Sequence, residues 1–226
     1  MYHISIAQEA AMSVRNVSNW GGNIIGKFPS LKLNRAVQFE STLERDYLHV
    51  LDYDQAVTFF EEQPLVIEYQ HERKTRRYTP DFHIVRCSQN ILIECKPAIL
   101  VNTEVNQRKF IAAQQFCTER GWAFQIITDA ELRQGFQLNN IKLLRRYACH
   151  AIHPAIKSQI YALLHDAPTL LTIGQIQAVT TQPVVALTSV LHMAFYHELV
   201  IDLDRAPISG NSSVTLPQSV QPGGHA

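Results

Sequence analysis

The chain has 226 residues, of which 46% are hydrophobic and 18% are charged, a globular composition that excludes a largely disordered protein. Lysine plus arginine and aspartate plus glutamate both number 20, so no global positive charge points to a nucleic-acid partner, and binding of a polyanion would depend on local patches. The first residues lack the basic head and apolar stretch of a signal peptide, and no segment has about 18 consecutive apolar residues, so we expect a soluble cytoplasmic protein with no membrane contact.

The first regular element is predicted after residue 40. Residues 1–35 carry glycines and Pro29 among polar residues without clear periodicity, so we predict irregular structure there, with one short strand at most. Ser41 can cap a helix that continues to Asp54. Apolar residues recur at helical spacing along it: Leu43, Tyr47, Leu48, Val50 and Leu51.

Three β-rich segments follow, LVIEY (65–69), RYTPDFHIV (77–85) and ILIEC (91–95), and they predict an antiparallel meander. Residues 103–120 then predict an amphipathic helix that ends at Gly121, with the buried strand WAFQIIT behind it. A strand, a helix and a strand in this order indicate a parallel crossover. The first domain is therefore predicted to be a mixed α/β fold.

The pattern changes near residues 147–152, after a predicted helix at 138–149. We therefore predict three parts: a catalytic domain at 1–150, a second domain at 151–216 and a disordered tail at 217–226 that is rich in Pro, Gly, Ser and Gln. The second domain has the element order of an α+β winged helix-turn-helix. Its predicted elements are helices at 154–166, 173–180 and 183–196, the strand LVIDLD and a short strand near VTL.

Charged residues gather on the last two strands of the meander. Side chains alternate along a strand, so Glu94 and Lys96 share one face, opposite Cys95. If a two-residue turn joins these strands, the residue numbers of each cross-strand pair add up to an odd number. Asp81 then lies on the same sheet face as Glu94 and Lys96. The same pattern, Pro80-Asp81 followed by Glu94-Cys95-Lys96, also fits a surface hairpin with an ordinary ion pair.

Two carboxylates in a core hairpin need a compensating partner, and a divalent cation would supply it. Mg²⁺ prefers oxygen ligands and takes one or two protein carboxylates with water and phosphate, which Asp81 and Glu94 offer; the carbonyl of Cys95 is a third candidate ligand, and Mn²⁺ is expected to substitute. The metal would activate a water while Lys96 orients it or stabilises the transition state. The pattern therefore favours phosphodiester hydrolysis.

Glu44 is the candidate third carboxylate, because a helical projection places it on the apolar face of the first helix. The alternative is a capping box, in which Glu44 bonds the backbone amide of Ser41. Gln63 precedes Pro64 at the start of a strand; it either ends a loop or contacts the site, and it is a secondary candidate.

A basic cluster precedes the Asp81 strand. It would contact DNA phosphates beside a nuclease site, although such a run is also typical of a solvated loop: Arg73, Lys74, Arg76 and Arg77. A second basic group could extend this track along the helix before the domain boundary, although a solvated helix face is the favoured interpretation: Arg133, Lys142, Arg145 and Arg146. The four cysteines contain no C-x-x-C pair and His150 with His153 lacks a third ligand, so no zinc site is predicted.

Taken together, these motifs resemble the TnsA endonuclease subunit of heteromeric bacterial transposases. The resemblance covers most of residues 25–150, and the winged-helix prediction fits the second domain of that family. The matching stretches are GKFPSLKLNRAVQFESTLERDYL, FFEEQPLVIEY, RRYTPDFHIV, ILIECKP and GWAFQIITD.

The resemblance implies a restriction-endonuclease-like PD-(D/E)xK fold with Glu44, Asp81, Glu94 and Lys96 in the metal and catalytic positions. Some family members carry Gln where this chain has Glu94, which is closer to the general nuclease pattern. It also implies cleavage of the 5′, non-transferred strand at transposon ends in a bacterial cytoplasm. The implied partners are DNA, a TnsB-like transposase of the DDE class and a TnsC-like AAA+ regulator.

Two other functions remain open from the sequence. A free-standing restriction or repair nuclease of the same fold would cut DNA alone. A winged-helix DNA-binding regulator would need no catalysis, but the predicted third helix at 183–196 carries no lysine or arginine, which disfavours base reading and favours protein contact.

Overall fold

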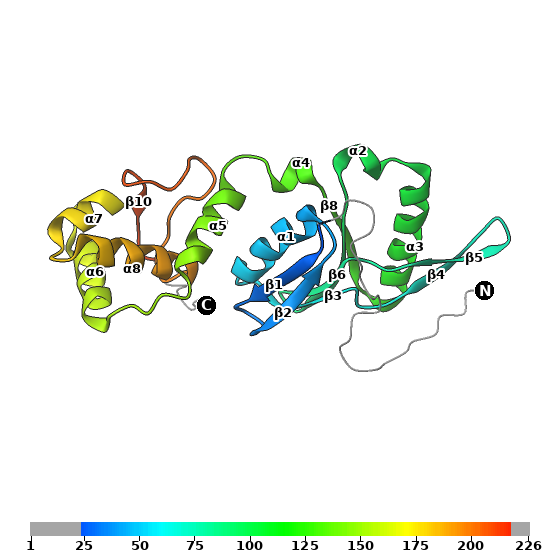
Figure 1. Cartoon of the computed structure of the whole chain (residues 1–226), viewed down its shortest axis with the longest axis horizontal. Helices are drawn as coiled ribbons and strands as arrows, with labels where there is room; N and C mark the ends of the chain where they lie inside the picture. Colours follow the sequence, from blue (N-terminus) through cyan, green and yellow to red (C-terminus); the bar gives the residue numbers. More distant parts are fainter. Residues whose placement is uncertain (1–23, 218–226) are drawn as a thin grey trace, which may run out of the picture. The chain divides into compact units, whose positions relative to one another are not determined.

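The computed structural model describes residues 24–217, which divide into two compact units at the bond between Gln134 and Gly135. The first unit holds most of the strands, and the second is mainly helical (Figure 1). Two predictions fall partly outside the described residues. They are the irregular structure of residues 1–35, up to residue 23, and the disordered tail, from residue 218 onward. No helix of the described part is long and apolar enough to cross a membrane.

A four-stranded sheet forms the centre of the first unit. Its strands are β3 (Val57–Glu62), β6 (Phe82–Arg86), β7 (Gln89–Cys95) and β8 (Ala123–Ile127), in the order β3-β6-β7-β8. β6 is antiparallel to both neighbours, whereas β7 and β8 are parallel. The chain passes between these parallel strands through α2 (Ala98–Val101) and α3 (Glu104–Arg120), so the predicted crossover and the mixed α/β fold are confirmed.

Alternation along β7 separates two apolar layers. Ile91 and Ile93 pack into a core with α1 (Thr42–Tyr53), whereas Leu92 packs with residues of α3 such as Phe116. Ser41 caps α1 as predicted, accepting a hydrogen bond from the Glu44 amide at 3.1 Å. The sheet therefore has a helix packed on each face, α1 on one and α3 on the other.

The predicted meander is wrong in its first part. β4 (Ile67–His71) and β5 (Lys74–Tyr78) pair only with each other and form a hairpin that extends past α3 (Figure 1). The predicted strand 77–85 is interrupted at residues 79–81, where Pro80 has no backbone amide to donate to a ladder. Besides β7, the antiparallel neighbour of β6 is β3, for which no strand is predicted from the sequence.

A second hairpin replaces part of the predicted irregular region. β1 (Gly26–Ser30) pairs with β2 (Arg35–Phe39), and Phe28 and Val37 are buried in the α1 core. Pro29 has no backbone amide to donate, but the two strands form a sheet of their own, and edge strands tolerate proline. A short helix, α4 (Asp129–Leu132), ends the described elements of the first unit.

The second unit begins before the predicted boundary near residue 150. It contains α5 (Gln137–Tyr147), α6 (Pro154–Asp166), α7 (Ile173–Val179) and α8 (Pro183–Phe195), together with the short antiparallel pair β9 (Leu171–Thr172) and β10 (Ser213–Val214). The predicted strand LVIDLD is not formed, because only a single bridge joins Val200 to Thr215. Asn140 of α5 holds the segment that follows α8 by donating to the carbonyls of Leu203 and Ala206, both at 2.8 Å.

Candidate functional site

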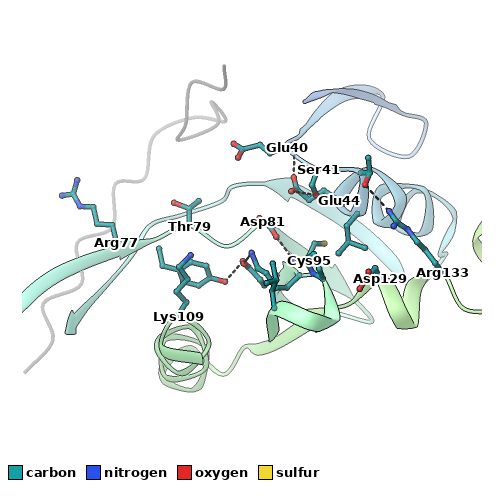
Figure 2. Close-up of a pocket in the computed structure, with 17 residues that line it drawn as sticks. Glu40, Ser41, Glu44, Arg77, Thr79, Asp81, Cys95, Lys109, Asp129 and Arg133 are labelled. Atoms are coloured by element: carbon teal, nitrogen blue, oxygen red, sulfur yellow. Dashed lines mark hydrogen bonds and ion pairs between the residues drawn. The ribbon is translucent and has the colours of Figure 1, made fainter. Parts of the chain in front are cut away.

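A polar cavity of about 420 Å³ opens in the first unit where β7 ends (Figure 2). The start of α1, the segment between β5 and β6, the residues after β7 and the side of α3 contribute to its wall. The cavity contains every residue that the sequence predicted as a catalytic residue or metal ligand: Glu44, Asp81, Glu94, Cys95 and Lys96.

Backbone register brings Asp81 and Glu94 to the same place. β6 and β7 are joined by the two-residue turn Cys87-Ser88, whose positive φ angles of 49° and 63° fit a tight hairpin turn. The resulting register pairs Phe82 with Ile93, so Asp81 is the next residue opposite Glu94. The ladder continues there, because the Asp81 amide donates to the Ile93 carbonyl at 3.0 Å.

Two donors hold the carboxylate of Glu94, which is only 3% exposed. The ammonium of Lys96 lies 2.8 Å from Oε1, and the hydroxyl of Tyr78 donates to Oε2 at 2.7 Å. Burial alone would lower the pKa of Lys96, but the carboxylates around it, Glu94 foremost, raise it. The lysine is therefore held in its charged form beside the glutamate.

The surroundings of Asp81 disfavour its ionised form. Its Oδ2 accepts a hydrogen bond from the Cys95 amide at 2.7 Å, which favours the ionised form. Burial nevertheless raises the pKa of Asp81 well above its usual value, with further contributions from Glu94 and Glu44. Three carboxylates therefore repel one another across the cavity, and Lys96 offsets only part of this repulsion.

Glu44 combines features of both alternatives that the sequence left open. Its Oε1 accepts from the Ser41 hydroxyl at 2.8 Å and its Oε2 accepts from the Glu40 amide at 2.7 Å, so the predicted bond to the Ser41 amide is replaced by one to the preceding residue. The same carboxylate lines the cavity, and burial raises its pKa, with Glu40 and Glu94 adding to the shift. Glu44 can therefore cap α1 and face the cavity at the same time.

Gln63 does not line the cavity, but it contacts residues that do. Its side-chain amide donates to Oε1 of Glu40, and its backbone amide donates to the Asp81 carbonyl at 2.8 Å. A positive φ of 46° at Gln63 directs the chain into this arrangement. Gln63 therefore supports the segment that carries Asp81 from outside the cavity wall.

The basic cluster lies on the β4–β5 hairpin. Arg73 is in its turn, and Lys74, Arg76 and Arg77 follow on β5; all four are exposed. Only Arg77 of this group lines the cavity, and its guanidinium pairs with Glu68 across the hairpin at 2.9 Å. The hairpin therefore carries positive charge from the cavity edge outward.

Sequence reasoning missed several cavity residues. Tyr78 and Lys109 were not singled out, and Arg133 was interpreted as part of a solvated face. Arg133 instead lines the cavity, with its Nε 2.9 Å from Asp46 of α1. No local motif marks Lys109 or Arg133, because α3 and the end of α4 reach the cavity only through tertiary packing.

The donor set suits a hard cation such as Mg²⁺. Within residues 24–217, no three His, Cys, Asp or Glu side chains are close enough to enclose a metal by themselves. Mg²⁺ does not need such a cage, because it commonly binds one or two carboxylates and keeps several waters. Each bonded oxygen of Asp81 and Glu94 retains a second lone pair. Burial raises the pKa of the Cys95 thiol well above its usual value, so the backbone carbonyl is the better ligand at that residue.

Comparison with known protein families gives one match. Residues 54–129 match the model of the TnsA-like endonuclease N terminal, a segment that contains Asp81, Glu94 and Lys96 and ends with β8 and the start of α4. The resemblance inferred from the motifs is thereby confirmed over these residues. No curated protein that was compared matches the chain significantly.

Proposed function

We propose, from the premise that residues 54–129 are a TnsA-like endonuclease domain, that the chain is a divalent-metal-dependent nuclease that cuts DNA at the cavity. One observation carries the proposal: Asp81, just before β6, lies opposite Glu94 near the end of β7, with Lys96 bonded to Glu94 and Glu44 facing the same cavity. The family match itself supports a nuclease of the transposition-associated kind.

Each residue has a role that follows from its contacts. Asp81 and Glu94 would hold Mg²⁺, or Mn²⁺ in its place, with the Cys95 carbonyl and Glu44 as further oxygen ligands. The bound metal would supply an activated water and neutralise charge on the phosphate. Lys96 carries its positive charge 2.8 Å from Glu94 and can stabilise the extra negative charge of the pentacovalent transition state. Tyr78 keeps the Glu94 carboxylate in one orientation.

The DNA backbone is proposed to lie along the β4–β5 hairpin and enter the cavity beside Arg77. Arg73, Lys74 and Arg76 are exposed, so they can reach phosphates without leaving buried partners unpaired. The protein carries no global positive charge, and this hairpin is where its local charge favours a polyanion.

The substrate is proposed to be the 5′, non-transferred strand at transposon ends, with a TnsB-like transposase and a TnsC-like AAA+ regulator as partners. The second unit is proposed to be a winged helix that contacts protein. Residues 151–217 contain two basic residues, Lys157 and Arg205, against four acidic ones, which disfavours a polyanion there. Val184 on α8 and Val179 on α7 are exposed apolar side chains of the kind that partner surfaces use.

The test is to map broken ends on donor DNA mixed with the protein, its neighbouring transposase and its regulator. Asp81→Ala should abolish breaks in the 5′ strand while joining of the 3′ strand continues, and Asp166→Ala, at an exposed carboxylate of α6, should cut like the wild type. Cutting by the protein alone would instead indicate a free-standing nuclease. Unchanged breaks with Asp81→Ala would indicate a non-enzymatic binder and refute the proposal.

A further inference from the structure

The basic side chains that line the cavity differ in whether a carboxylate pairs with them. Of the described residues, four basic ones line it. Three of the four lie within ion-pair distance of a carboxylate: Lys96 with Glu94 at 2.8 Å, Arg77 with Glu68 at 2.9 Å and Arg133 with Asp46 at 2.9 Å.

The fourth is Lys109, and its charge is matched by no carboxylate among residues 24–217. Its ammonium instead lies 5.8 Å from the centre of the Tyr78 ring, a weak cation–π contact. The residue is half-buried, and the next residue, Phe110, is in the core, where its ring lies 5.9 Å from that of Phe124. The backbone of Lys109 is thus fixed by packing while its charge remains available.

Lys109 also lies on a distinct side of the cavity. It extends from α3, whereas Glu44 and Ser41 extend from the start of α1, and Asp81 lies between them in Figure 2. Tyr78 links Lys109 to Glu94 of β7, because its ring contacts Lys109 and its hydroxyl donates to Glu94 at 2.7 Å. Lys109 is therefore close to the reacting groups but separated from them by the Tyr78 side chain.

We propose that Lys109 binds a backbone phosphate of the DNA strand next to the phosphate that is cut. This rests on the proposed nuclease function, and it adds a positioning residue that the sequence motifs do not contain. A lysine ammonium is a compact charge that binds phosphate well, and it needs no fixed orientation. Lys96 is engaged by Glu94, so the cavity has one lysine for the reacting phosphate and another for its neighbour.

The test uses Lys109→Met in the full chain, because methionine keeps an unbranched stem over the Tyr78 ring and removes only the charge. Affinity for a short fluorescent DNA duplex is measured by anisotropy in EDTA over a range of salt concentrations. The dissociation constant should rise roughly five- to tenfold, and the slope of log affinity against log salt should become about one unit shallower. Lys109→Arg should keep both values near those of the wild type.

Arg108→Met is the matched control, since it removes one positive charge from the adjacent position of α3, where Arg108 pairs with Glu104 and does not line the cavity. It should leave the salt slope nearly unchanged. An unaltered affinity and slope in Lys109→Met, or equal losses in both variants, would overturn the assignment. Nicking by Asp81→Ala is measured in parallel: if that variant still cuts, the nuclease proposal fails, whereas its inactivity combined with normal binding by Lys109→Met refutes only the role of Lys109.

Discussion

The backbone amide of Cys95 donates a hydrogen bond of 2.7 Å to the carboxylate of Asp81. This bond ties the residue that precedes β6 to the last residue of β7, at the point where the two strands open into the cavity. Asp81 is thereby held as a partly buried carboxylate beside Glu94 and Glu44, although their mutual repulsion opposes ionisation. The fold thus retains a carboxylate at a position where its charge lowers the free energy of unfolding, which is common at sites that bind cations.

Replacing Asp81 by asparagine should therefore stabilise the fold while removing activity. The pKa of Asp81 is raised by burial, so the folded state binds its proton more tightly than the unfolded state, and the contribution of Asp81 to stability falls as pH rises above about 4. We expect Asp81→Asn to be more stable by on the order of 1 kcal/mol at neutral pH in EDTA, and the gain to vanish toward pH 4. Urea denaturation at several pH values measures this; a less stable variant at neutral pH would contradict it.

The Lys96–Glu94 pair should show strong coupling in a double-mutant cycle. Lys96→Met leaves the carboxylate of Glu94 buried with only the Tyr78 hydroxyl, and we expect a loss of roughly 2 kcal/mol or more of unfolding free energy. Glu94→Gln in the same chain should recover most of this loss, because it removes the unpaired charge. Additive effects of the two substitutions would show that the pair contributes little.

Tyr78→Phe should lower the affinity for the metal more than it lowers the stability of the fold. The ring stays in place, but Oε2 of Glu94 loses its donor, so the carboxylate can rotate. We expect the Mg²⁺ concentration at half-maximal nicking to rise several-fold and Mn²⁺ affinity, followed by electron paramagnetic resonance, to fall in parallel. Tyr69→Phe, on the paired strand β4, is the control and should change neither quantity. Equal metal affinities in Tyr78→Phe and wild type would exclude this role.

The β4–β5 hairpin should supply salt-dependent binding. Substituting Arg73, Lys74 and Arg76 by glutamine removes three exposed charges and leaves the Arg77–Glu68 pair intact. Because each lost phosphate contact lowers the salt slope by about 0.9, we expect the slope to fall by about three units. Lys27→Gln, at an exposed lysine of β1, is a single-charge comparison that should alter the slope little. A slope that stays at the wild-type value would place the DNA elsewhere.

The part of the site that lies on two neighbouring strands could be predicted from local sequence rules. The alternation of side chains and a two-residue turn predict that Asp81 and Glu94 face each other, and the register of β6 and β7 has this geometry. The helix cap at Ser41 was predictable for the same reason, because a cap acts within four residues.

Features that depend on distant contacts were not predictable from one sequence. The hairpin β4–β5 leaves the sheet because Pro80 interrupts the ladder, and β3 takes the position beside β6. Lys109 and Arg133 reach the cavity through the packing of α3 and α4, and their own helices carry no pattern that distinguishes them from solvated residues. The choice between cap and site at Glu44 could not be made by spacing, because the two geometries coexist.

The two donors on Glu94 have a consequence for the speed of the reaction. With Lys96 on one oxygen and Tyr78 on the other, both carboxylate oxygens have a protein partner before any DNA arrives. The conformational entropy of this side chain is thus lost during folding, and little reorganisation is left for the encounter with substrate. The rate of cutting should then follow the delivery of the strand to a site that is already ordered.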